Sequence, residues 1–267
     1  MTERSILNWL RRRKEVKGIG DDCAILGDIL ITTDMFIESV HFRRAQPPHV
    51  LGHRALARGL SDIAAMGGDP MWCLLSLALA KWTDEKWVRE FYKGFLGLAE
   101  RYEVKLVGGD LSHSNRVTAD IVAIGIARKG TALGRNGAKV GDGIYVSGDL
   151  GGRPLLPEPR IEFGKFLRGV ATACMDLSDG LSADLPRLCE ASGVAASIDR
   201  PLPVAPGATL EQALHAGEDY ELLYTCSGEA PGIRIGTIVE GKPGRVEYLG
   251  RKLAVKGYDH FRPNHRS

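Results

Sequence analysis

Aspartates recur in this sequence at the ends of short apolar stretches, which is where ligand sites form in layered α/β structures. The set comprises Asp21, Asp22, Asp34, Asp62, Asp110, Asp176 and Asp179. Carboxylates that converge without a cation repel one another and resist burial. Hard cations prefer oxygen ligands and remove that cost, and Mg²⁺ does so most often where phosphates complete its shell. The pattern therefore indicates metal-dependent phosphate chemistry.

Each aspartate, taken alone, is also typical of a helix cap or a turn. Ser178 and Asp179, for example, would cap a helix that begins at "GLSADL" well. Asp62 fits this explanation poorly, because it lies inside a helical stretch with Arg58 and small residues such as Gly59 within one turn. Small residues on that face leave room for a ligand, so Asp62 favours the site interpretation.

The familiar phosphate-binding motifs are missing from the sequence. It has no G-x-x-x-x-G-K-[ST] motif of a P-loop enzyme, and "GIGDDC" places Cys23 where the third glycine of a dinucleotide fingerprint belongs. Protein-kinase signatures are also absent. The remaining possibility is phosphate held by several Mg²⁺ ions, by the glycine-rich backbone of "VGGD" and "GRNGAKVGDG", and by Arg135.

Composition limits the class of protein. The 267 residues are 44% hydrophobic and 25% charged, as in a soluble globular protein with one large or two smaller cores. The net charge of +2 with mixed signs predicts no binding of nucleic acid or an anionic membrane. The longest apolar run, residues 72–80, is too short to span a bilayer. The basic residues 11–17 after "SILNWL" favour a solvated first helix over a targeting segment.

Cysteine and histidine spacing excludes two further classes. The five cysteines are scattered without a C-x-x-C pair, which argues against a disulfide framework and a structural zinc site. The seven histidines show no H-E-x-x-H spacing. These observations predict a cytoplasmic protein without zinc chemistry.

The apolar periodicity predicts alternating strands and helices. We expect strands at residues 29–36, 71–80, 104–110, 119–130, 143–151, 174–178, 194–199, 233–241 and 246–255. We expect helices at residues 49–68, 83–103, 161–173 and 179–193. A glycine-rich composition shift near residues 130–135 predicts two α+β domains, residues 1–133 and residues 134–267, each of two layers.

Several motifs occur in an order that resembles the thiamine-monophosphate kinase family, within the aminoimidazole ribonucleotide synthetase superfamily. They are "GIGDDCAI", "TTDMFIESVHF", "ALARGLSDIAAMGGDP", "GGDLSHS", "GRNGAKVGDGIYVSGDLG", "MDLSDGLSADL" and "AGEDYELLYT". The matches continue to the terminal "GYDHF" and so cover nearly the whole chain. Ordered motifs over this length are far more specific than a single glycine pattern.

The resemblance implies an activity and an assembly. The activity is transfer of the γ-phosphate of ATP to thiamine monophosphate, giving thiamine diphosphate and ADP with the help of several Mg²⁺ ions. The assembly is a homodimer in which strands of the N-terminal α+β domain, residues 1–133, pair with a second subunit in a barrel. Residues 134–267 would form a C-terminal α+β domain.

The resemblance also implies site residues, position by position. The Mg²⁺ ligands would be Asp22, Thr32, Thr33, Asp34, Asp62, Asp110, Asp176 and Asp179. The ATP contacts would be Gly109, Asp110, Arg135 and Ser178. The thiamine phosphate would contact His41, Glu218 and Tyr258. From sequence alone, His41 is more typical of an edge histidine packed against Phe42, and Glu218 and Tyr258 are also typical of a surface charge and a core aromatic.

No residue is expected to act as a general base. The attacking group is a phosphate monoester, whose second pKa is about 6, so it is already largely anionic at neutral pH. Positioning and charge neutralisation would then supply nearly all of the catalysis. We expect direct in-line transfer without a phosphoenzyme, with Mg²⁺ joining donor and acceptor phosphates.

The sequence departs from the family pattern in two places, and two other functions stay open. Ala216 stands where the family usually has glycine, and the connection at residues 152–160 is shorter than is typical. One alternative is another ATP-using member of the superfamily with a different acceptor. A selenophosphate synthetase would want a mobile reactive cysteine, whereas Cys23 lies in an apolar run that predicts burial. The other alternative, a non-catalytic nucleotide-sensing dimer, would not need an intact acidic set.

Overall fold

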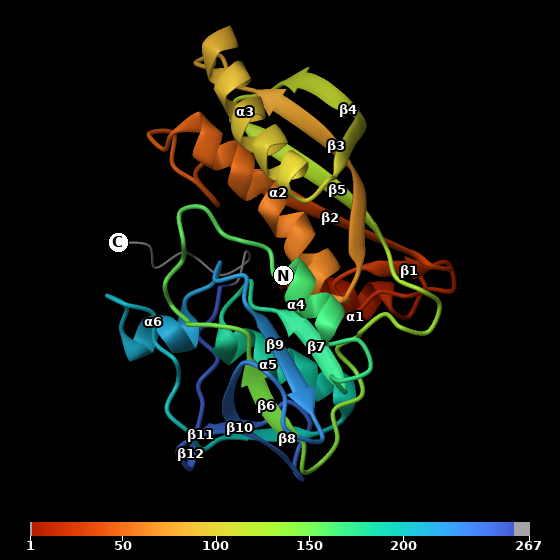
Figure 1. Ribbon diagram of the computed structural model, residues 1–267. Coiled ribbons are helices and arrows are strands. Elements are labelled where there is room, and N and C mark those ends of the chain that lie inside the picture. Colours follow the sequence, from red (N-terminus) through yellow and green to blue (C-terminus); the bar gives the residue numbers. More distant parts are fainter. Residues whose placement is uncertain (1, 259–267) are drawn as a thin grey trace.

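A five-stranded sheet forms the first half of the computed structural model, which describes residues 2–258. Its strands run in the order β1-β2-β5-β3-β4, and β3 and β4 are parallel while the other neighbours are antiparallel. Their bounds are β1 Ala24–Leu26, β2 Ile29–Ile37, β3 Asp69–Leu79, β4 Lys105–His113 and β5 Thr118–Ile126. Helices α2 (Pro48–Ala65) and α3 (Glu85–Arg101) cover one face of this sheet (Figure 1).

Helix α2 lies at the centre of the molecule, because it contacts the first sheet, α3 and the later helix α4 (Ile161–Phe166). Most of its side chains are buried, among them Leu51, Leu56 and Leu60. Close approach to α3 requires glycine at Gly94, where a Cβ atom would lie 1.7 Å from the carbonyl oxygen of His49. A rigid, buried helix is a suitable support for a site residue such as Asp62.

A seven-stranded sheet forms the second half, in the order β12-β11-β8-β10-β6-β9-β7. Its strands are β6 Gly143–Val146, β7 Ala173–Asp176, β8 Ala195–Ile198, β9 Leu222–Cys226, β10 Ile233–Val239, β11 Val246–Tyr248 and β12 Arg251–Lys252. Helices α5 (Leu181–Ser192) and α6 (Leu210–His215) accompany it (Figure 1). All side chains of β6, β7 and β9 are buried, as expected for strands covered on both faces.

The two halves share part of their core. One hydrophobic cluster joins Leu56 and Phe95 of the first half to Tyr145 and Tyr224 of the second. Helix α4 packs directly on α2, where a Cβ atom on Gly164 would lie 2.0 Å from the carbonyl oxygen of Ala64. The two sheets therefore hold fixed positions around α2, and the division at residues 133 and 134 stays a prediction.

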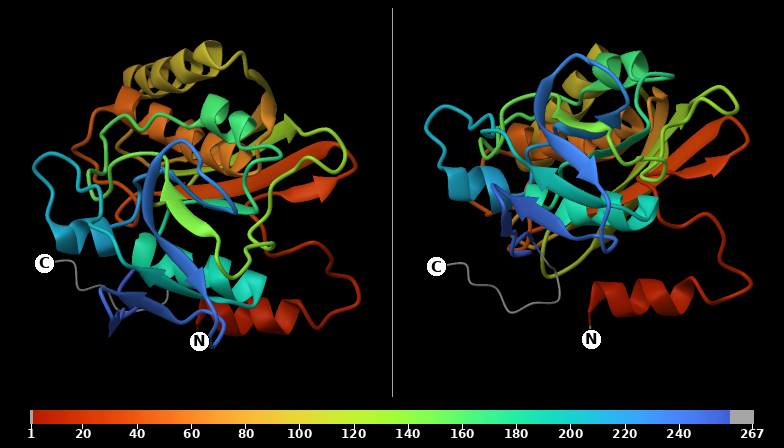
Figure 2. Two further views of the ribbon diagram at one scale, coloured as in Figure 1. Left: turned by 60° about the horizontal axis from the view of Figure 1, so that its bottom comes forward. Right: turned by 90° about the horizontal axis from the view of Figure 1, so that it is seen from below.

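The structure confirms the predicted α+β class and the positions of the main elements. The short helix α1 (Glu3–Leu10) is largely exposed, with Trp9 56% accessible, and it lies outside both sheets, as Figure 2 shows. Within residues 2–258 of this single chain the first sheet stays open, with β1 and β4 at its edges. A barrel, as the resemblance implies, would need strands from a second copy. None of the helices described within these residues is long and apolar enough to cross a membrane.

Candidate functional site

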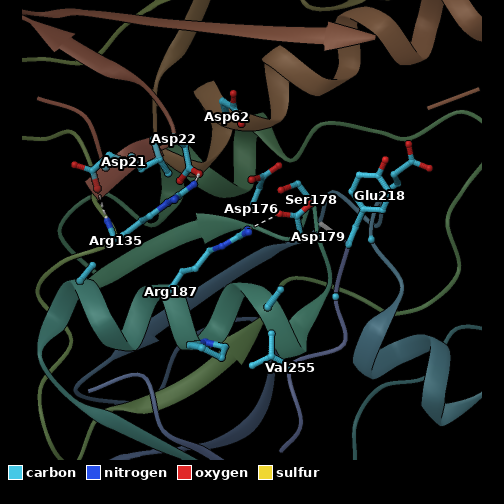
Figure 3. Close-up of a pocket in the computed structure, with 18 of the residues that line it drawn as sticks. Asp21, Asp22, Asp62, Arg135, Asp176, Ser178, Asp179, Arg187, Glu218 and Val255 are labelled. Carbon is cyan, nitrogen blue, oxygen red and sulfur yellow. Dashed lines mark hydrogen bonds and ion pairs between the residues drawn. The ribbon is translucent and has the colours of Figure 1, made fainter. Parts of the chain in front are cut away.

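Three of the predicted metal-binding aspartates meet at one end of a cavity of about 950 Å³. Asp22 precedes β1, Asp62 lies near the C-terminal end of α2, and Asp176 ends β7. Each offers a carboxylate oxygen, and these oxygens all lie within 4.8 Å of one another (Figure 3). Residues far apart in sequence are thus brought together by the packing of α2 between the two sheets.

The electrostatics of this cluster suit a divalent cation. Burial, followed by the negative charge of Asp176, raises the pKa of Asp62 well above its usual range. Burial and the charge of Asp22 do the same for the pKa of Asp176. Burial also raises the pKa of Asp22, whose buried Oδ2 atom has no hydrogen-bond partner among the described residues. An unpaired carboxylate oxygen beside two others is a donor set that fits Mg²⁺.

Neutral hydroxyl groups fix the orientation of two of these carboxylates. Ser61 donates a hydrogen bond of 2.7 Å to Asp176, and Thr32 donates one of 2.5 Å to Asp62. Each hydroxyl leaves the other carboxylate oxygen available to a ligand. Thr33 also lines the cavity, but its hydroxyl donates to Asp120 at 2.9 Å.

Arg135 closes the end of the cavity beside Asp22. Its guanidinium donates to the Asp22 carboxylate, and its backbone N–H donates to Asp21 at 2.7 Å (Figure 3). The two adjacent aspartates are therefore both accommodated by Arg135: Asp21 accepts from its backbone N–H, and Asp22 pairs with its cationic guanidinium. A guanidinium in this place can also bind phosphate oxygens in bidentate fashion.

The segment before α5 supplies two further cavity residues, Ser178 and Asp179. Asp179 accepts from the guanidinium of Arg187 at 2.5 Å. The prediction that Ser178 and Asp179 cap α5 is wrong: the cap is Gly180, without a side-chain hydrogen bond. Asp184 instead accepts from the backbone N–H groups of Asp179 and Gly180, both at 3.0 Å, which leaves Ser178 and Asp179 facing the cavity.

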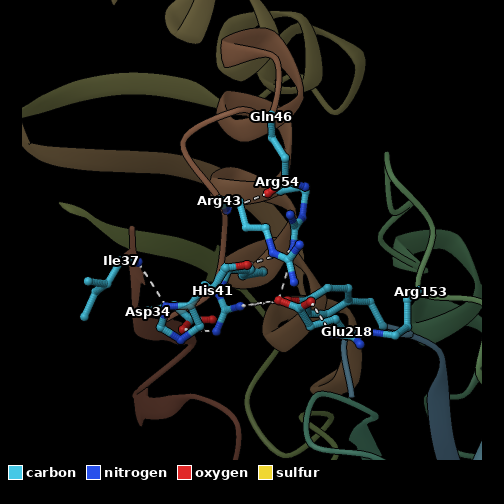
Figure 4. Close-up of polar contacts among 10 residues, drawn as sticks. Asp34, Ile37, His41, Arg43, Gln46, Arg54, Arg153 and Glu218 are labelled. Carbon is cyan, nitrogen blue, oxygen red and sulfur yellow. Dashed lines mark hydrogen bonds and ion pairs between the residues drawn. The ribbon is translucent and has the colours of Figure 1, made fainter. Parts of the chain in front are cut away.

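The opposite end of the cavity is formed around Glu218. Arg54 pairs with Glu218 at 3.0 Å, and Arg153 pairs with the same carboxylate at 3.1 Å. Figure 4 shows both arginines reaching Glu218 from different parts of the chain. His41 lines the same space, with its Nδ1 atom accepting from the backbone N–H of Ile37 at 3.0 Å. An adjoining hollow of about 540 Å³ continues from His41 and Glu218.

Tyr258, the third residue expected at the acceptor, also lines the cavity, and its backbone N–H donates to the backbone carbonyl oxygen of Asp179 at 3.0 Å. The remaining residues of the terminal motif, 259–261, lie outside the described residues.

Asp34 lies between the two ends of the cavity, paired with Arg58 at 3.0 Å. From the sequence, Arg58 is named only as a neighbour of Asp62. The sequence does not predict that Arg54 and Arg153 line the site. A signal was available for two of them, because Arg54, Arg58 and Asp62 are spaced four residues apart and share one face of α2.

Gly109 and Asp110 are the predicted site residues that this chain does not bring to the cavity. Both lie on β4, at the edge of the first sheet, and are exposed. The cavity-lining residues of the described chain do not include them. Their expected contacts with ATP and Mg²⁺ stay predictions.

Ala216, which stands where the family usually has glycine, has an ordinary φ of −76°. Alanine therefore fits this backbone without strain. Its neighbour Gly217 is constrained, since a Cβ atom there would lie 2.3 Å from the carbonyl oxygen of Ser178. Arg153, from the short 152–160 connection, reaches Glu218 directly, so that connection contributes a side chain to the site.

Similarity to known proteins extends over nearly the whole chain. Residues 20–127 match the family described as AIR synthase related protein, N-terminal domain. A thiamine-monophosphate kinase of Aquifex aeolicus is 33% identical over 303 residues, covering 97% of this chain and 98% of the relative. One from Salmonella typhimurium is 38% identical, covering 91% of each. The solved structure of AaThiL complexed with AMPPCP and TMP superposes with a TM-score of 0.90 at 32% identity, covering 97% of both chains.

Proposed function

The chain belongs to the thiamine-monophosphate kinase family, and on that basis we propose that it transfers the γ-phosphate of ATP to thiamine monophosphate. The products are thiamine diphosphate and ADP. The observation that carries the proposal is one cavity with the carboxylates of Asp22, Asp62 and Asp176 and the guanidinium of Arg135 at one end, and His41 and Glu218 at the other. Such a cavity can hold a polyphosphate and a cationic acceptor together.

Mg²⁺ is the cation that this donor set suits, and several ions are expected. Asp22, Asp62 and Asp176 would hold it directly, since their oxygens already lie within 4.8 Å of one another. The further candidates are Thr32, Thr33, Asp34, Asp110 and Asp179. Bound Mg²⁺ supplies neutralisation of the phosphate charges, which otherwise keep donor and acceptor apart.

We propose direct in-line transfer without a general base. An oxygen of the acceptor phosphate forms a bond to the γ-phosphorus of ATP, and the bond from that phosphorus to the β,γ-bridging oxygen breaks with its electron pair leaving on ADP. The attacking oxygen carries no proton at neutral pH, since the second pKa of a phosphate monoester is about 6. Arg135 and Ser178 would bind and orient the ATP phosphates.

The acceptor binds through its thiazolium ring, a flat cation. The carboxylate of Glu218 offers an opposite charge, and the close ion pairs with Arg54 and Arg153 hold it in place. Tyr258 offers an aromatic face for the same ring. His41, which lines both hollows beside Glu218, would contact the rest of the molecule.

We further propose that two copies assemble through the first sheet. Exposed apolar side chains occur on four of its strands, namely Ile25, Leu26, Ile29, Met35, Trp72, Val107 and Leu111. An exposed apolar sheet with an open edge is a typical surface for pairing with another chain. In such a dimer Gly109 and Asp110 would take part in a site shared with the partner. The five cysteines, all buried and unbridged, support a cytoplasmic location.

The test is an assay of the purified protein with ATP, Mg²⁺ and thiamine monophosphate. We expect thiamine diphosphate and ADP in equal amounts, and loss of both products when EDTA is added. Thiamine, aminoimidazole precursors and selenide serve as alternative acceptors. Product from one of these alone would assign the chain to another activity of the superfamily, and ATP binding without any turnover would indicate a nucleotide sensor.

A further inference from the structure

Arg58 connects the two ends of the cavity. Its guanidinium Nη2 atom lies 3.0 Å from Asp34, while Nη1 donates to the Tyr220 hydroxyl at 2.9 Å and lies 3.6 Å from Glu218. Asp34 is one of the proposed metal ligands, and Glu218 lies at the acceptor end. If thiamine monophosphate binds with its thiazolium ring near Glu218 and its phosphate oxygens toward the metal cluster, the phosphate must lie between these two ends. The guanidinium of Arg58 is fixed in that position.

The position of Arg58 is set by two rigid supports. It lies on the buried helix α2, one turn after Arg54 and one turn before Asp62. Its guanidinium lies over the ring of Phe36, with the guanidinium carbon 5.8 Å from the ring centre. The side chain is only 11% exposed, yet it lines the cavity. A guanidinium held in this way loses little further freedom when it binds a ligand.

Arg58 also has donor capacity to spare. A guanidinium carries five N–H donors in a planar fork that matches phosphate oxygens. Its Nε atom is buried and has no hydrogen-bond partner among the described residues. The bond from Nη2 to Asp34 is exchangeable, because an Asp34 carboxylate that ligates a cation holds Arg58 less strongly.

We propose that Arg58 binds the phosphate of the acceptor, thiamine monophosphate, and holds it between the metal cluster and Glu218. This proposal rests on the proposed function and assigns to Arg58 a contact with a reacting group. Arg58 exchanges its bond to Asp34 for one to the acceptor phosphate. It neutralises part of the charge that opposes approach to ATP.

The experiment compares the affinity for thiamine monophosphate with that for thiamine, which differs by the phosphate alone. Binding is measured by calorimetry with Mg²⁺ and a non-hydrolysable ATP analogue, in the wild type and in Arg58→Met and Arg58→Lys. Arg89→Met, on the exposed face of α3, is the matched control. Thermal unfolding and binding of the ATP analogue are recorded for each variant.

We expect Arg58→Met to weaken thiamine monophosphate binding at least tenfold and to leave thiamine and the ATP analogue within about twofold, with Arg58→Lys intermediate. Equal losses for thiamine and thiamine monophosphate would overturn the proposal, because a residue that only supports Glu218 affects both ligands. Selective loss of the ATP analogue would also overturn it and place Arg58 on the donor. If Arg58→Met does not fold, Arg58→Lys gives the same comparison. A wild type that binds neither thiamine compound refutes the proposed function instead.

Discussion

The guanidinium of Arg135 donates a hydrogen bond to the buried carboxylate of Asp22, across 113 residues of chain. The pair joins the segment before β1 to the loop that leads into the second sheet. It satisfies Oδ1 of Asp22 and leaves Oδ2 without a hydrogen-bond partner among the described residues. The same aspartate therefore fixes a loop with one oxygen and offers the other to the carboxylate cluster.

Replacing Asp22 with asparagine should raise the Mg²⁺ concentration needed for half-maximal turnover by about tenfold or more, since one anionic oxygen of the cluster is lost. The amide oxygen can still accept from Arg135, so the loop should keep its position. Turnover measured against Mg²⁺ at saturating ATP and thiamine monophosphate tests this. An unchanged Mg²⁺ dependence would show that Asp22 is not a ligand.

Asp62→Asn and Asp34→Asn should each give a folded protein with turnover reduced at least about 100-fold, or about 2.7 kcal/mol of transition-state stabilisation. Asparagine keeps the shape of the side chain and an oxygen for Thr32 or Arg58, but it removes the charge that attracts a cation. The measurement is kcat at limiting Mg²⁺, with circular dichroism as the folding control. Wild-type rates in either variant would contradict the metal cluster.

The stability of the metal-free protein should fall as pH rises above about 4. Burial and mutual repulsion raise the pKa of Asp62 and Asp176 in the folded state, so the folded protein holds protons that the unfolded chain has released. Bound Mg²⁺ displaces those protons. The rise in Tm on adding Mg²⁺ should therefore be larger at about pH 8 than at about pH 5.

The control for this pH dependence is Asp176→Asn, which removes one of the repelling charges. It should raise the Tm of the metal-free protein at about pH 8 and shrink the increment from Mg²⁺. An increment that is independent of pH in the wild type would mean that the ions bind elsewhere.

The sequence predicted most of the elements and most of the cavity residues, because burial and periodicity act locally and the acidic motifs are ordered along the chain. It could not predict which aspartates pair with cations, since Arg58 with Asp34 and Arg187 with Asp179 depend on how elements pack. The cap of α5 was missed for the same reason. Asp184 supplies from inside the helix the oxygen that Ser178 or Asp179 was expected to supply.

Leu111→Arg should convert the proposed dimer to monomers. The Leu111 side chain is 64% exposed on the edge strand β4, where a charge would be costly in an apolar interface but harmless to one chain. Light scattering after size-exclusion chromatography gives the molar mass. Val140→Arg, at a 60% exposed site outside the first sheet, is the matched control. If Leu111→Arg has the same molar mass as the wild type, assembly through this edge is ruled out. This holds both for a wild type that is dimeric and for one that is monomeric.

The backbone around Glu218 can be tested with two opposite substitutions at adjacent positions. Gly217→Ala places a methyl group 2.3 Å from the carbonyl oxygen of Ser178, so the loop must move, at a cost of about 1–3 kcal/mol. We expect a lower Tm and a KM for thiamine monophosphate raised at least about fivefold, because Glu218 follows directly at a φ of +68°. Ala216→Gly should leave the Tm nearly unchanged and should change the KM for thiamine monophosphate by less than about twofold, since Ala216 needs no special conformation. A raised KM in Ala216→Gly, or none in Gly217→Ala, would show that this loop does not position the acceptor.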